Sequence, residues 1–118
     1  MKDYDSTSYA YSMSFYHSPD QINAMLTPAA TYSAPQPTMS QRAAQVASPA
    51  RKILIGEWMS NHQRVGEEKG WWNWQGSRNF LFADGHAEYR DAQAIRPAND
   101  ALPDPNLTVD GVLGQDTD

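Results

Sequence analysis

The chain has 118 residues and is 40 % hydrophobic, which suits one small domain with a modest core. Nine Lys/Arg and nine Asp/Glu lie within residues 1–96, whereas residues 97–118 hold five Asp and no basic residue, so the net charge of −5 belongs to the C-terminal end. This charge balance argues against nucleic-acid binding, and the absence of cysteine excludes disulfides, thiol catalysis and zinc–thiolate sites.

The first third of the chain predicts one short strand and one short helix. Polar and aromatic residues alternate in residues 8–12, as they do in a half-buried strand. Ser18 can cap a helix that has Pro19 in its first turn and Gln21 at the capping-box position, and we expect this helix to end near Met25. The three prolines of residues 27–39 predict a surface loop.

The middle of the chain contains the strongest strand signal. Residues 40–46 predict one or two helical turns before Pro49. Residues 52–58, KILIGEW, then form a short apolar run that is rich in β-branched residues and bounded by charges. We expect this run to be the central strand of a sheet.

Residues 79–90, NFLFADGHAEYR, predict a β-hairpin. Asp84 and Gly85 separate two β-compatible runs, and a two-residue type I′ turn would place both residues at the tip. Counting outward from this turn puts His86 on a polar face of the hairpin. The pairs predicted on the opposite, core-facing side are Phe80 with Tyr89 and Phe82 with Ala87.

An acid and an imidazole beside a glycine also raise a catalytic alternative. The turn by itself accounts for Asp84, because Asp tolerates the left-handed region and bonds nearby amides. No nucleophile stands at a matching spacing from His86, so we predict a structural turn formed by Asp84 and Gly85 and no catalytic residue. The predicted elements together indicate an α+β fold, with a small antiparallel sheet, a C-terminal hairpin, short helices and long loops.

The stretch from Trp74 to His86 resembles the C-terminal signature of prepilin-type, pseudopilin-like proteins. That signature is a His, nine residues and then Asp-Gly, with the typical wording H-x-G-x-x-N-x-L-F-A-D-G-H. The chain matches this wording at Gly76, Asn79 and residues 81–86. Residues 48–57 are similar to the strand that precedes the signature in the family, so the resemblance covers roughly residues 43–92.

Two features depart from the family pattern. Trp74 replaces the signature His, which puts any role of that imidazole in doubt. The sequence also lacks the apolar N-terminal helix that family members use as a membrane anchor or as filament core. Either the chain was trimmed of that helix or it is a divergent member that lost its anchor, and the polar start, Met1-Lys2-Asp3, favours trimming.

The resemblance implies the soluble head of a pseudopilin-like protein, a non-enzymatic structural subunit of a type II secretion-like or pilus-like filament. It implies an extracytoplasmic location, in the periplasm or at the cell surface, with other pilin-like or secretion-system subunits as partners. Membrane contact is expected only through the missing helix. We expect residues 1–96 to form one pseudopilin-like globular domain, and residues 97–118 to form an acidic, Pro/Asp-rich tail that is extended or partly disordered.

The tryptophans suggest an alternative function, a carbohydrate- or peptide-binding module. Aromatic faces stack on the apolar faces of sugars, but the same residues would also fill a small core or a subunit interface, and we favour this second interpretation. The candidate ligand or interface residues are Trp58, Trp71, Trp72, Trp74 and His86.

The acidic end contains one candidate metal site, although no cofactor is otherwise expected. Oxygen-bearing side chains at alternate positions, followed by Gly111, resemble the first half of a calcium-binding loop. Thr117 stands where such a loop needs a bidentate Glu, so a solvated acidic tail is the competing interpretation. The candidate calcium ligands are Asp104, Asn106, Thr108 and Asp110.

Overall fold

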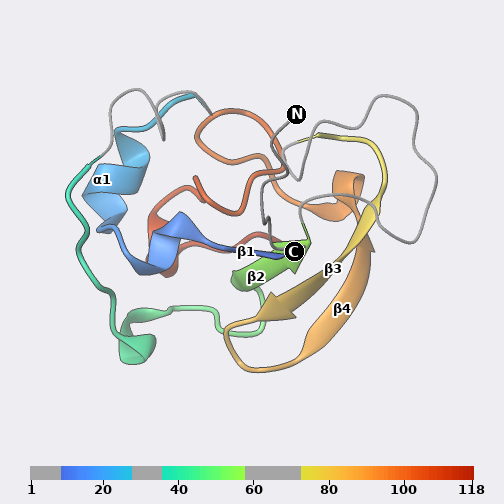
Figure 1. Ribbon diagram of the computed structural model, residues 1–118, viewed down its shortest axis with the longest axis horizontal. Coiled ribbons are helices and arrows are strands. Elements are labelled where there is room, and N and C mark those ends of the chain that lie inside the picture. The colour runs from blue at the N-terminus through green and yellow to red at the C-terminus, as the bar shows by residue number, and fades with distance from the viewer. Residues whose placement is uncertain (1–8, 28–35, 58–72) are drawn as a thin grey trace, which may run out of the picture.

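The computed structural model describes residues 9–27, 36–57 and 73–118 (Figure 1). Its centre is a four-stranded antiparallel sheet with the strand order β1-β2-β3-β4. The strands are β1 (Tyr9–Tyr11), β2 (Ile53–Glu57), β3 (Ser77–Phe82) and β4 (Ala87–Asp91). The predicted α+β class, the small antiparallel sheet and the C-terminal hairpin are confirmed, and the apolar run in the middle of the chain forms the inner strand β2.

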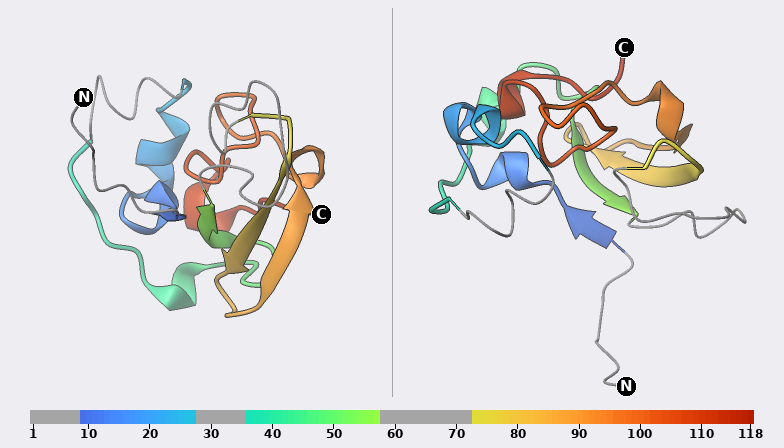
Figure 2. Two further views of the ribbon diagram at one scale, coloured as in Figure 1. Left: turned by 45° about the vertical axis from the view of Figure 1, so that its right-hand side comes forward. Right: turned by 90° about the horizontal axis from the view of Figure 1, so that it is seen from above.

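The α-helix of residues 19–23 and the 3-10 helices of residues 13–15 and 111–113 pack together on the side of the molecule away from the hairpin (Figures 1 and 2). The helix α1 (Pro19–Asn23) begins with the predicted capping box, in which Ser18 and Gln21 exchange side-chain and backbone hydrogen bonds. None of the helices in the described residues is long and apolar enough to cross a membrane. The 3-10 helices are η1 (Met13–Phe15), η2 (Ala43–Gln45), η3 (Ala92–Ala94) and η4 (Gly111–Leu113).

Two small apolar clusters form the core. The cluster under the sheet consists of Ile53, Phe80, Phe82 and Ile95. The cluster beside α1 consists of Ile22, Met25, Ala98 and Leu107, with Met13 packed against it. Since Ala98 and Leu107 belong to the C-terminal segment, the second cluster joins the two ends of the described chain.

The C-terminal segment, residues 97–118, differs from the extended or partly disordered tail that the sequence predicts. Its turns pack between the sheet and α1 (Figures 1 and 2), and η4 contacts both α1 and η1. Leu107 and Val112 are fully buried, and so are the polar side chains of Asp104, Asp116 and Thr117. The prediction fails because these carboxylates face inward onto hydrogen-bond donors, which composition alone does not reveal.

The hairpin register also differs by one residue from the predicted pairing. Phe80 lies opposite Glu88, and Tyr89 lies opposite Asn79, so Tyr89 faces away from the core and is 52 % exposed. The cause is the turn: the amide of Gly85 donates to the carbonyl of Phe82, and only Gly85, at φ +91°, takes the left-handed conformation there. A three-residue loop that ends in a left-handed glycine replaces the predicted two-residue turn.

Candidate functional site

The hairpin tip brings Asp84 and His86 together. The backbone amide of His86 donates to Asp84 Oδ1 at 3.1 Å, and the same oxygen contacts His86 Nδ1. The imidazole stacks on the Phe82 ring, with 4.5 Å between ring centroids and 10° between planes. His86 therefore lies on the same side of the hairpin as Phe82. Its predicted position on the opposite, polar side is wrong, because the register of the hairpin is shifted by one residue.

Alternating charges continue from the tip along β4. His86 Nε2 lies 3.5 Å from Glu88 Oε1, and Glu88 also pairs with Arg90. Hydrogen bonds from the backbone and side chain of His86 lower the pKa of Asp84, and the hydrogen bond from Arg90 lowers the pKa of Glu88. Both ring nitrogens of His86 thus face carboxylates, an arrangement that orients the imidazole at the tip of the hairpin.

Trp74 lies just before β3, in the bend formed by residues 73–76, and is partly buried. Carbonyl oxygens on either side of it accept hydrogen bonds from the fully buried guanidinium of Arg78, at 3.5 Å for Asn73 and 3.1 Å for Gln75. Trp74, which stands where the resemblance expects a His, therefore lies between two backbone carbonyl groups that bind Arg78. The other candidate aromatic residues, Trp58, Trp71 and Trp72, lie outside the described residues, so the aromatic binding cluster stays a prediction.

A groove of about 470 Å³ runs beside the hairpin tip. Tyr11 and Phe15 meet edge to face in its wall, with ring centroids 6.3 Å apart, and Tyr11 remains 54 % exposed. The lining comes from four separate parts of the chain and includes Tyr11, Phe15, Tyr16, Val46, Leu54 and Ala83. Sequence reasoning missed this groove, because only the fold brings those parts together.

A buried lysine lies where β1, β2 and the C-terminal segment meet. Lys52 is 0 % exposed, and its ammonium group donates to Asp116 Oδ2 at 2.8 Å and to the carbonyl oxygens of Ile53 and Pro105 at 2.9 and 3.3 Å. Burial lowers the pKa of Lys52, and this effect exceeds the opposing attraction of Asp116. The sequence did not indicate that Lys52 is buried and paired with Asp116, because a charged residue next to an apolar strand is common and is usually exposed.

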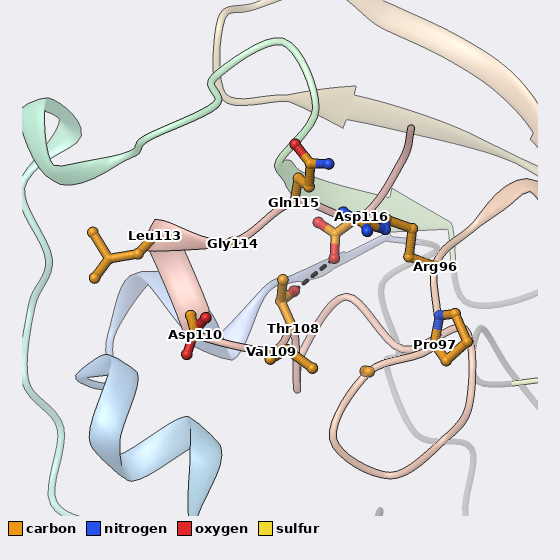
Figure 3. A pocket seen from close by; sticks show the side chains of 10 residues that line it. Arg96, Pro97, Thr108, Val109, Asp110, Leu113, Gly114, Gln115 and Asp116 are labelled. Atoms are coloured by element: carbon orange, nitrogen blue, oxygen red, sulfur yellow. Dashed lines mark hydrogen bonds between the residues drawn. The ribbon is translucent and has the colours of Figure 1, made fainter.

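The candidate calcium ligands take part in hydrogen bonds within the protein. The Thr108 hydroxyl donates to Asp116 Oδ1 at 2.6 Å, in the wall of a pocket of about 560 Å³ (Figure 3). Asn106 Oδ1 accepts from the Met13 amide, and Asp110 Oδ1 accepts from Asn23. Within residues 9–27, 36–57 and 73–118, no group of three or more His, Asp or Glu side chains is arranged to hold a metal. The calcium site stays a prediction.

Asp104, the first of these candidates, is 2 % exposed. Burial raises its pKa well above the ordinary range, and a hydrogen bond with Asp100 adds to the effect. One of its oxygens accepts from the Asn106 amide at 3.0 Å. The interior around Asp104 therefore favours the protonated carboxyl group over the charged carboxylate.

Comparison of this chain with protein-family models, with curated proteins and with solved structures finds no match.

Proposed function

We propose that this chain is a non-enzymatic structural subunit, the pseudopilin-like head of a type II secretion-like or pilus-like filament. The observation that carries the proposal is the position, within the sheet, of the residues that resemble the family signature. The ILIGE run is β2, the stretch Asn79–Phe82 lies in the neighbouring strand β3, and Asp84 and Gly85 close the hairpin. The signature residues therefore shape the sheet, as expected of a protein that works by packing.

The surface of the described residues suits contact with other proteins. Tyr9, Tyr11 and Tyr89 are each more than half exposed, and they share one face of the sheet because Tyr9 and Tyr89 lie in one row across it. Tyr11 also opens into the aromatic groove. Exposed aromatic side chains are enriched at the centres of protein interfaces, because they bury a large area with little loss of conformational freedom.

The partners in this proposal are other pilin-like or secretion-system subunits, and the location is extracytoplasmic. Attachment to a membrane would belong to an apolar N-terminal helix of the kind that family members carry. The head itself would supply the contacts that set the order of subunits, with the groove beside Tyr11 receiving an apolar side chain from a neighbouring subunit.

Photo-crosslinking from the groove tests the proposal. A photoreactive phenylalanine analogue replaces Tyr11 in the cells that produce the chain, and a matched chain carries it at Leu113, which has the same exposed fraction of 54 %. We expect adducts from position 11 with proteins that have an apolar N-terminal helix, identified by mass spectrometry. Equal adduct yields from the two positions, or adducts only with unrelated proteins, would contradict the proposal.

A further inference from the structure

The buried contact between β2 and the C-terminal segment has the features of a covalent cross-link site. We propose that Lys52 and Asp116 join spontaneously in an intramolecular isopeptide bond, which closes a loop between residues 64 positions apart. The inference does not depend on the proposed function, because it rests on this side-chain cluster alone.

The two reacting groups are in contact and sealed from water. Lys52 Nζ lies 2.8 Å from Asp116 Oδ2, and the two side chains are 0 % and 2 % exposed. The ring of Phe15 lies over the amine, 5.5 Å from its centroid. Proximity of this kind makes an otherwise slow condensation effectively unimolecular, and a dry site opposes the reverse hydrolysis.

The amine is disposed to act as a nucleophile. Because burial lowers the pKa of Lys52, the neutral amine is more accessible than it is for a lysine in water. The carbonyl oxygens of Ile53 and Pro105 accept its other hydrogen bonds and hold the nitrogen beside the carboxyl group.

Asp116 is held as the electrophile. The Ile53 amide donates to Oδ2 at 2.7 Å, and the Thr108 hydroxyl donates to Oδ1 at 2.6 Å. Figure 3 shows the Thr108 hydroxyl directed at this carboxyl group. Donors on both oxygens fix the plane of the group and stabilise the negative charge that develops on oxygen when the carboxyl carbon is attacked.

Asp104 lies next to this cluster, and we assign it the role of proton donor. It is the residue before Pro105, whose carbonyl contacts Lys52 Nζ, and its charge acts on both Lys52 and Asp116. Burial raises the pKa of Asp104, which favours the protonated form that a general acid needs in order to give a proton to the departing oxygen and recover it from the ammonium.

The reaction balances without a co-reactant. Nζ attacks Cγ of Asp116, a C–N bond forms and one C–O bond breaks. The released oxygen leaves as water, with two protons that come in total from the ammonium group. The third proton stays on the amide nitrogen, and the positive and negative charges of the original pair cancel.

Mass spectrometry of the denatured, purified chain tests the inference. We expect a mass lower than that of the sequence by one water. Trypsin does not cut at Arg96, which precedes proline, so the cross-linked digest should contain a branched peptide of residues 52–64 joined to residues 91–118. The branched peptide excludes a cyclic imide at Asp84-Gly85 or Asp110-Gly111, which would also lose one water.

Three variants complete the experiment. Lys52→Met and Asp116→Ala should each have the full sequence mass, whether or not they fold, since the mass is read on denatured protein. Asp104→Asn keeps both reacting groups and should form the cross-link at least tenfold more slowly after refolding, as expected for loss of a general acid. A wild-type chain that keeps its full mass after prolonged incubation in the folded state overturns the inference, and an unchanged rate in Asp104→Asn overturns the role of Asp104.

Discussion

The β3–β4 hairpin and the C-terminal segment, residues 97–118, are stabilised in different ways. The hairpin forms from neighbours in sequence, through a backbone ladder over the buried rings of Phe80 and Phe82. The C-terminal segment is mostly irregular turns, and side chains connect it to distant residues. Ser12, for example, donates to the carbonyl of Pro105 at 2.6 Å across 93 positions.

The difference shows that an acidic, proline-rich composition does not by itself make a segment flexible. Asp116 accepts hydrogen bonds from Lys52, Ile53 and Thr108, and therefore anchors the segment to β2 in place of a strand pairing. In the hairpin, by contrast, carboxylates lie at the surface and pair with their neighbours on β4. The C-terminal segment thus has buried carboxyl groups, whereas those of the hairpin lie at the surface. Mutations of charged residues should therefore lower the free energy of unfolding more in the C-terminal segment than in the hairpin.

The largest effect is expected from Asp116→Ala. Removing one partner of a buried ion pair leaves the other charge without compensation, and the free energy of unfolding should fall by about 3–5 kcal/mol. Chemical denaturation measures this loss against freshly refolded wild-type protein that still has the full sequence mass, so that the proposed Lys52–Asp116 cross-link does not enter the comparison. The double variant Lys52→Met/Asp116→Leu is the control and should lose much less, because it leaves no buried charge; an equal loss would locate the effect in packing rather than in charge.

The next effect is the pH dependence that Asp104 contributes. The folded-state pKa of Asp104 is raised above the unfolded value of about 3.9. Between these two pKa values, the folded state therefore binds more protons than the unfolded state. Stability due to Asp104 is complete below that unfolded value and is lost as the pH rises through the folded pKa. Asp104→Asn should flatten this decline and raise stability at neutral pH.

Denaturation midpoints between pH 4 and pH 8 check this expectation. Asp118→Asn serves as the control, because the Asp118 side chain is 93 % exposed and the variant should keep the wild-type pH profile. A profile of Asp104→Asn that superimposes on the wild type would show that Asp104 ionises normally.

A smaller effect is expected at the hairpin turn. Gly85 has φ +91°, and a Cβ built there meets no atom within 4 Å, so Gly85→Ala introduces backbone strain without a clash. The free energy of unfolding should fall by about 1–2 kcal/mol, the usual cost of a left-handed conformation for an L-residue. Gly85→Asn should lose less, because Asn tolerates this conformation. Thermal unfolding of the two variants compares them, and equal stability would argue for a different turn.

The smallest effect is expected from Tyr89→Ser. In the observed register Tyr89 is half exposed on the outer face, so the free energy of unfolding should change by no more than about 0.5 kcal/mol. The predicted register would have placed Tyr89 in the core opposite Phe80, where the same substitution costs several times more. Phe80→Ser is the matched control, and a similar loss in both variants would favour the predicted register.

Local signals in the sequence located most of the regular elements. The capping box at Ser18 and Gln21 identified the start of α1, because both of its hydrogen bonds join residues three positions apart. The apolar run in residues 53–57 identified β2, and the Asp-Gly pair identified the hairpin. The register was missed because one extra residue in the turn moves every side chain of β4 to the other face. The aromatic groove and the Lys52 cluster were missed because their members come from distant parts of the chain.

The sequence by itself determined the elements whose stabilising contacts lie within a few residues, namely the capped helix, the apolar strand and the existence of a hairpin. Only the tertiary structure decided which aspartate side chains of residues 97–118 are buried and which are exposed. The cost of burying Asp104 or Asp116 depends on the donors that surround it, and Lys52 and Thr108 reach Asp116 only when the chain is folded. The same five aspartates that suggest a solvated tail in the sequence therefore include the internal anchors of the fold.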